Sequence, residues 1–297
     1  MINKLRTFLF RRLRGPAQPL EGIERSSPEK LYGAYGLTYE ASPFLTPEVL
    51  KERELLRDQP ISDIQFDEAA TLAMSEMSRL PFGLQTEYLS FHRNRFFELD
   101  NIAAKLIQEQ RELVPRVLDV GMSVNTLIIQ KLLPSARVET TDRLGLDLGD
   151  CPITYHPLDL TDPDLDKVDL GQRYDVILFA EVIEHLIANP VRVLRFFIRH
   201  LTPNGRIILT TPNFFAEVRL HMMRSRKNPQ PIFPEHLDRN TAIEHHVREY
   251  SISELLELCV DAGGKPATFF YSSCWDRDPQ NIPEEQWLNL VVVIGPT

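Results

Sequence analysis

The chain has 297 residues, of which 43% are hydrophobic and 25% are charged, as in an ordinary globular protein with one large domain or two smaller ones. Its net charge of −9 argues against nucleic acid as a partner, because proteins that bind nucleic acid normally carry a basic patch or stripe. The three cysteines form no short CxxC pair, which argues against a disulfide framework or a thiolate zinc site and indicates a reducing, cytoplasmic compartment.

The first 14 residues form a basic segment with five Lys or Arg residues and no acidic residue. Apolar residues recur in it at helical spacing, so a helix here is amphipathic. Two interpretations stay open: a solvated terminus, or a basic helix that makes peripheral contact with the inner face of an anionic membrane. Residues 15–43 are rich in Pro, Gly and Ser, so residues 1–45 are predicted to be a basic N-terminal segment followed by an irregular linker.

Residues 46–112 are predicted to form a helical N-terminal region. Thr46 followed by Pro47 is typical of a helix start, and a second apolar-periodic stretch covers residues 62–79. The third stretch has the strongest helical period, and its expected apolar face consists of Leu84, Tyr88, Phe91, Leu99, Ile102, Ala103 and Leu106. Such a face needs a partner that covers it.

Residues 113–297 are predicted to form a Rossmann-like α/β domain, because short apolar runs alternate with helical segments. The expected strands are 116–120, 137–141, 153–158, 174–180, 206–211, 267–272 and 287–294. The expected helices are 125–133, 191–201 and 251–262, and residues 202–205 are expected to form a tight turn before the fifth strand. This alternation predicts a mostly parallel sheet with helices on both faces.

Acidic residues follow three consecutive predicted strands, at the edge where ligands bind in open α/β sheets. Asp119 is near the end of the first strand, and Gly121 then permits a sharp turn close to a ligand. Asp142 follows the second strand, where a carboxylate accepts hydrogen bonds from a ribose diol. Asp159 follows the third strand and can accept from an adenine amino group. One such acid alone is best explained as a solvated loop residue, but three in succession indicate a binding site.

Several motifs together resemble the class I S-adenosylmethionine-dependent methyltransferases. They are VLDVG at 117–121, Asp142, Asp159, YDVILFAEVIEHL at 174–186, LTPNG at 201–205, LTTPN at 209–213 and HVREY at 246–250. The resemblance implies a seven-stranded sheet with an antiparallel last strand, and S-adenosyl-L-methionine as the cofactor.

The resemblance also implies a role for each matching residue. Asp119, Gly121 and Ser123 lie at the cofactor's methionine part, Asp142 at its ribose and Asp159 at its adenine, and the backbone of Ala180 and Glu181 lies beside the methyl donor. The family's first turn has two further glycines, where this chain has Ser123 and Asn125. Serine is small and asparagine tolerates a positive φ, so we expect the turn to form. If it does not, the alternative is a non-catalytic Rossmann-like binding protein.

The residues after the fourth predicted strand form an acidic and histidine-rich cluster. One helical turn would place Glu181, Glu184 and His185 on one side, and His246 is the expected fourth member. Two carboxylates with imidazoles suit a divalent metal such as Mg²⁺, as in the ubiquinone-pathway and small-RNA 2′-O-methyltransferases that share this Glu-x-x-Glu-His pattern. In the alternative interpretation, Glu181 flanks the cofactor, and Glu184 and His185 only orient the loop.

His185 and Glu181 are the expected catalytic residues, because the ordinary pKa of an imidazole suits removal of a proton at neutral pH. Residues 214–241 interrupt the sheet pattern and are expected to lie over the acceptor pocket. We therefore predict O-methylation of a small-molecule, saccharide or lipid-linked acceptor. An RNA 2′-O-methyltransferase is the second enzymatic alternative.

Overall fold

The computed structural model describes residues 45–78, 80, 86–110, 114–143, 145, 148–149, 151–229, 246–273 and 282–297. The basic segment and linker predicted for residues 1–45 lie almost entirely outside the described residues, as do Leu84 and residues 230–241 of the predicted insertion. Residues Thr46–Thr297 form one compact unit. The predicted boundary between residues 112 and 113 therefore stays an interpretation of the sequence.

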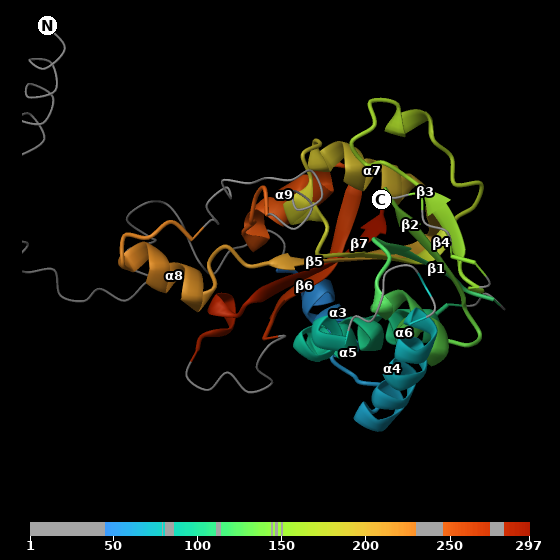
Figure 1. Ribbon diagram of the computed structural model, residues 1–297. Helices are drawn as coiled ribbons and strands as arrows, with labels where there is room; N and C mark the ends of the chain where they lie inside the picture. The colour runs from blue at the N-terminus through green and yellow to red at the C-terminus, as the bar shows by residue number, and fades with distance from the viewer. Residues whose placement is uncertain are drawn as a thin grey trace, which may run out of the picture. The chain divides into compact units, whose positions relative to one another are not determined.

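The described part contains a seven-stranded sheet with the order β3-β2-β1-β4-β5-β7-β6 (Figure 1). Strands β1 to β5 are parallel, and β7 is antiparallel to both β5 and β6. This arrangement confirms the predicted Rossmann-like fold with its antiparallel last strand. The strands are β1 (Arg116–Val120), β2 (Arg137–Asp142), β3 (Thr154–Pro157), β4 (Tyr174–Ala180), β5 (Leu201–Pro212), β6 (Gly264–Ser272) and β7 (Asn289–Pro296).

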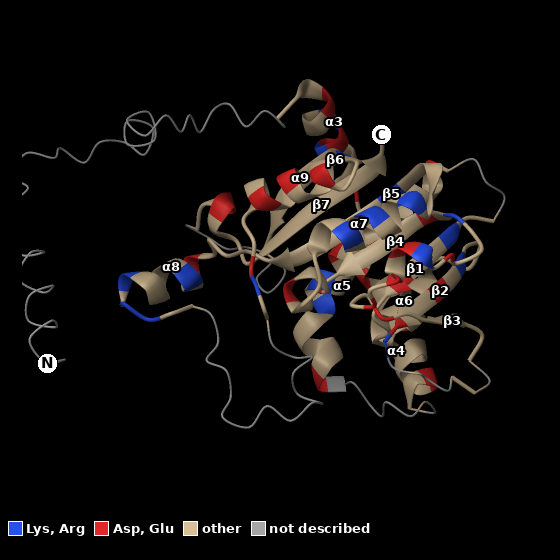
Figure 2. Ribbon diagram, turned by 90° about the horizontal axis from the view of Figure 1, so that it is seen from above, with Lys and Arg blue, Asp and Glu red and all other residues tan. Residues whose placement is uncertain are grey.

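Helices cover both faces of this sheet, as predicted (Figure 1). One face carries α3 (Pro47–Leu56), α4 (Asp63–Met77), α5 (Thr86–Gln108) and α6 (Val124–Leu132). The other carries α7 (Pro190–Arg199) and α9 (Ile252–Asp261), where Figure 2 shows the basic residues of α7 and the acidic residues of α9. The eight-residue helix α8 (Glu217–Arg224) follows β5 and buries none of its residues. None of the described helices is both long and apolar enough to cross a membrane.

Capping residues explain where several helices begin. Thr46 accepts a hydrogen bond from the backbone of Val49 with Pro47 in the first turn, as the sequence predicted. Ser62 and Ser251 each form a capping box with the residue three positions later. Because each cap involves residues within three positions of the helix start, these starts could be predicted from the sequence alone.

The structure corrects the apolar face predicted for α5. Leu99, Ile102, Ala103 and Leu106 are buried, but Tyr88 is 42% and Phe91 66% exposed. The second half of α5 packs in the core beneath the sheet. Its first half extends to the carboxyl edge of the sheet, where the side chains of Tyr88 and Phe91 are exposed to solvent.

The predicted turn at residues 202–205 is instead part of β5. Its pairing with β4 shifts register between Tyr174 and Val176, so β5 accommodates extra residues without ending. Gly205 lies in this irregularity, where an added Cβ would be only 2.6 Å from the carbonyl oxygen of Tyr174 and 3.0 Å from the backbone nitrogen of Thr202. Both obstacles are backbone atoms, so only glycine fits here without a shift of the strand.

We expect Gly205→Ala to destabilise the protein by about 1–3 kcal/mol, because the new methyl group would push two paired strands apart. This corresponds to a fall in Tm of roughly 3–10 °C, measured by thermal denaturation. Gly145→Ala is the matched control, since a Cβ at Gly145 meets no atom within 4 Å. Equal melting temperatures for the two variants would contradict the close approach at Gly205.

Candidate active site

The turn between β1 and α6 forms without the second and third glycines of the family pattern. Gly121 has a φ of +89°, a conformation that favours glycine, and its backbone nitrogen donates to the carbonyl of Thr141 at 2.8 Å. Ser123 caps α6 by accepting from the backbone of Asn125 at 3.1 Å, and its own backbone donates to the hydroxyl of Thr126 at 3.1 Å. The serine therefore supplies a helix cap where the family has a glycine.

Asn125 fits this turn in a different way from the one the sequence suggested. It lies inside α6 with a negative φ, and its side-chain nitrogen donates to the carboxylate of Asp100 at 3.1 Å. Both side chains are buried, and burial raises the pKa of Asp100 well above its ordinary value. Sequence reasoning missed Asp100, although acids inside the apolar half of α5, Glu98 and Asp100, were a readable signal.

Three acids converge at the carboxyl edge of β1, β2 and β3, as predicted. Asp119 is buried and accepts from the hydroxyl of Thr126 at 2.5 Å; burial, reinforced by the nearby charge of Asp142, raises its pKa to about 7. Asp142 ends β2, and its carbonyl accepts from the backbone of Leu158 at 3.0 Å. Asp159 is exposed, and hydrogen bonds from Thr161 lower its pKa.

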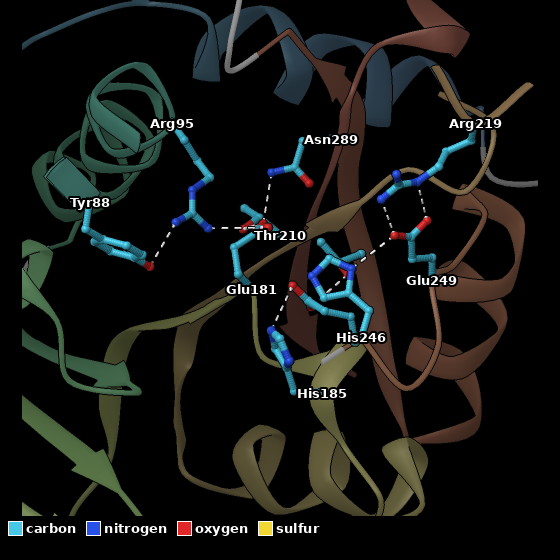
Figure 3. A network of polar contacts seen from close by, with 11 residues as sticks. Tyr88, Arg95, Glu181, His185, Thr210, Arg219, His246, Glu249 and Asn289 are labelled. Atoms are coloured by element: carbon cyan, nitrogen blue, oxygen red, sulfur yellow. Dashed lines mark hydrogen bonds and ion pairs between the residues drawn. The ribbon is translucent and has the colours of Figure 1, made fainter. Parts of the chain in front are cut away.

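Glu181, directly after β4, is held by three separate elements (Figure 3). One carboxylate oxygen accepts from the Thr210 hydroxyl of β5 at 2.8 Å and from the Asn289 amide of β7 at 2.9 Å. The other lies 3.4 Å from the guanidinium of Arg95 on α5. Glu181 also has a φ of +55°, which is costly for a residue with a side chain and persists only where its surroundings fix it.

Arg95 is a candidate site residue that the sequence analysis missed. Its side chain is only 5% exposed, and besides Glu181 it contacts the hydroxyl of Tyr88 at 3.4 Å (Figure 3). Its guanidinium also lies over the ring of Phe96. The sequence did offer a signal for it, because Arg95 is a charged residue among the aromatic residues of the third predicted helix. Arg95 brings the first half of α5 to the carboxyl edge of the sheet.

Glu184 and His185 lie in a 3₁₀ turn, Ile183–His185, rather than in an α-helical turn. Glu184 is fully buried, which raises its pKa to about 7, and one of its oxygens accepts from the Thr211 hydroxyl at 2.9 Å. Its other oxygen has no hydrogen-bond partner among the described residues and lies 3.8 Å from Nε2 of His185. The backbone of Val247 donates to the Glu184 carbonyl at 2.6 Å and so brings residues 246–250 to this turn.

The structure gathers three of the four residues predicted to cluster. Potential metal-ligand atoms of Glu184, His185 and His246 all lie within 4.8 Å of one another, and the two imidazole rings are 5.0 Å apart. The expectation that one helical turn also brings Glu181 into this group is wrong. The positive φ of Glu181 directs its carboxylate toward Arg95 and Thr210, away from the cluster.

The sequence profile of a family described as a methyltransferase domain matches residues 91–265, more than half of the chain. The chain belongs to this methyltransferase family. The match spans every residue predicted for cofactor binding, and together with the sheet order it confirms the assignment as an S-adenosylmethionine-dependent methyltransferase. No curated protein matches the chain.

Solved methyltransferase structures resemble the chain at low identity. A TehB-like S-adenosylmethionine-dependent methyltransferase from Corynebacterium glutamicum is 18% identical over 65% of this chain and 86% of its own, with a TM-score of 0.40. The plantazolicin methyltransferase BpumL is 15% identical over 84% of this chain and all of its own, with a TM-score of 0.47. The 1,6-didemethyltoxoflavin-N1-methyltransferase from Burkholderia thailandensis is 18% identical over 81% of this chain and 93% of its own, with a TM-score of 0.45.

We expect the affinity of this methyltransferase for S-adenosylmethionine to rise about tenfold between pH 6 and pH 8. Asp119, with a pKa of about 7, is mostly protonated at pH 6 and mostly ionised at pH 8, and only the ionised form attracts a cationic ligand. Calorimetric titration at several pH values measures this. Asp119→Asn should flatten the profile and weaken binding at pH 8, whereas Asp166→Asn, which changes an exposed acid, should leave both unchanged. An equally steep profile in Asp119→Asn would refute the assignment.

Proposed function

We propose that this methyltransferase transfers a methyl group to a hydroxyl oxygen of a small-molecule or saccharide acceptor. The observation that carries the proposal is the cluster of Glu184, His185 and His246 directly beyond β4, next to Glu181. An imidazole at this edge suits removal of a hydroxyl proton at neutral pH. The predicted cytoplasmic location, and the membrane contact of residues 1–14, stay predictions.

The turn around Gly121 fits the methionine part of S-adenosylmethionine. A Cβ added at Gly121 would meet only one atom within 4 Å, a methyl group of Val182 at 3.9 Å, so the turn is open to a ligand. In our proposal Gly121 and Ser123 approach the methionine part, Asp119 faces its ammonium group, and Asp142 accepts from the ribose diol. Asp159 then lies near the adenine amino group, and the backbone of Ala180 and Glu181 lies beside the reacting methyl group.

The chemistry needs little from the protein except alignment and proton removal. When bound, S-adenosylmethionine supplies an electrophilic methyl group, which an acceptor oxygen attacks in line with the departing sulfur. His185, whose side chain is 25% exposed, takes the hydroxyl proton in our proposal. Glu181 fixes the donor side of the site, because Thr210, Asn289 and Arg95 hold its carboxylate in one position.

The donor set of the cluster also fits a divalent cation. The buried Glu184 oxygen without a hydrogen-bond partner is an acceptor that a cation would satisfy, and two imidazoles complete a set of three ligands. We propose that Glu184, His185 and His246 hold such an ion and that Glu181 does not. Two imidazoles favour a transition metal over Mg²⁺. With the ion bound, His185 would be its ligand, and the ion would activate the acceptor by lowering the pKa of its hydroxyl; His185 takes the proton itself only in the metal-free site.

We expect Asp142→Asn to weaken the binding of S-adenosylmethionine about 10- to 100-fold, because the charged acceptor of two ribose hydrogen bonds is lost. Calorimetry with the full chain measures this, and Asp166→Asn again serves as the control with unchanged affinity. Wild-type protein that takes up no S-adenosylmethionine at high micromolar concentration would exclude catalysis and favour the alternative of a non-catalytic binding protein.

We expect His185→Gln to lower kcat about 10²- to 10⁴-fold while cofactor affinity stays within twofold of wild type. The assay is transfer of labelled methyl from S-adenosylmethionine to hydroxylated acceptors screened from cell extract. Glu184→Gln and a strong chelator should each lower activity if the cation takes part. Full activity in both would remove the metal from the proposal but would leave the methyl transfer intact.

A further inference from the structure

Three side chains form a chain of contacts from α8 to the cluster beyond β4 (Figure 3). Arg219 on α8 donates from Nε at 2.9 Å and from Nη2 at 2.5 Å, one bond to each carboxylate oxygen of Glu249. One of these oxygens also lies 3.0 Å from Nδ1 of His246. The Glu249 side chain has no exposed surface, so it is fixed from both sides.

This geometry determines which nitrogen of His246 carries the proton. The two-pronged contact with Arg219 holds Glu249 as a carboxylate, which accepts hydrogen bonds and donates none. Nδ1 of His246 must therefore be the donor, and in the neutral ring Nε2 keeps its lone pair. Because Nδ1 is taken by Glu249, Nε2 is the ring nitrogen left to bind a ligand together with Glu184 and His185.

A carboxylate that holds the far nitrogen of a metal-binding histidine is a common arrangement in metalloproteins, where it sets the tautomer and the orientation of the ring. In this chain a ring nitrogen of His246 lies within 4.8 Å of ligand atoms from Glu184 and His185. The His185 and His246 rings are also nearly perpendicular, with an interplanar angle of 82°. The two rings therefore present different orientations to the oxygen of Glu184 that has no hydrogen-bond partner among the described residues.

We propose that Glu249, held by Arg219, is a positioning residue that presents the Nε2 lone pair of His246 to a divalent cation shared with Glu184 and His185. This inference rests on the proposed metal site and adds the residues that orient one of its ligands. It also assigns a role to α8, a helix with no buried residue, because its Arg219 secures the carboxylate.

The alternative is that Arg219 and Glu249 only stabilise the fold, and the neighbouring ion pair provides a matched control. The side chain of Arg248, adjacent to Glu249 in the chain, pairs with Glu254 at 2.5 Å. Arg248→Ala removes a more exposed Arg–Glu pair from the same segment and keeps the backbone of residue 248. We therefore compare Glu249→Gln and Arg219→Ala with Arg248→Ala, all in the full chain.

The first measurement is the ¹⁵N chemical shift of the His246 ring in metal-free protein at pH 8, where an ordinary imidazole is neutral. Wild type and Arg248→Ala should show the proton on Nδ1, and Glu249→Gln should show a mixture of tautomers. A proton on Nε2 in the wild type would overturn the inference. The readout needs no metal, so it is independent of whether the proposed metal site exists.

The second measurement is Co²⁺ affinity, followed by absorption spectroscopy. Glu249→Gln and Arg219→Ala should weaken binding about 10- to 100-fold, and Arg248→Ala should not change it. If wild type has the expected tautomer but binds no Co²⁺, the metal site of the proposed function fails and so does its extension to Glu249. If wild type binds Co²⁺ and neither variant weakens it, only the positioning role fails. Arg219→Ala, at a partly exposed side chain, carries the test if Glu249→Gln does not fold.

Discussion

The contact between Glu181 and Arg95 is the interaction on which the site depends. It lies where β4 ends, and it joins this strand to α5, while Thr210 and Asn289 join the same carboxylate to β5 and β7. Arg95 is 5% and Glu181 18% exposed, so removal of either partner leaves a largely buried charge without its counter-ion. The pair therefore keeps Glu181 in its unfavourable backbone conformation and sets the direction of the chain that leads to Glu184.

A second constraint is the burial of several acids with few cations nearby. Asp100, Asp119 and Glu184 are all buried, and burial raises the pKa of each. Such groups resist ionisation until a positive charge arrives, so they favour cationic ligands over neutral ones. Asp119 beside the Gly121 turn suits the ammonium group of a methionine derivative, and Glu184 suits a metal ion. The two acids stand on the cofactor side and the acceptor side of the proposed site.

The sequence predicted those parts of the fold that depend on local patterns. Hydrophobic runs located the strands, caps located the helix starts, and acids at strand ends located Asp119, Asp142 and Asp159. Arg95 escaped prediction because 86 residues separate it from Glu181. Glu249 lies in the HVREY motif three residues after His246, but its role also depends on Arg219, which is 30 residues away. No local pattern encodes such pairings.

The clustering of Glu181 with Glu184 and His185 failed as a prediction for a different reason, because spacing predicts a shared face only if the backbone is helical. Here the backbone of Glu181 has a positive φ, and a 3₁₀ turn follows.

The alternation of side chains along β5 separates the two carboxylates. Successive side chains of a strand point to opposite faces of the sheet, so neighbouring Thr210 and Thr211 lie on different faces. Thr210 binds Glu181 on the face of α5, and Thr211 binds Glu184 on the other. Asn289, which pairs with Pro212, shares the face of Thr210 and also binds Glu181. The alternation of one strand thus holds one carboxylate on the face of α5 and leaves the other beside the histidines, which is why three residues cluster and the fourth does not.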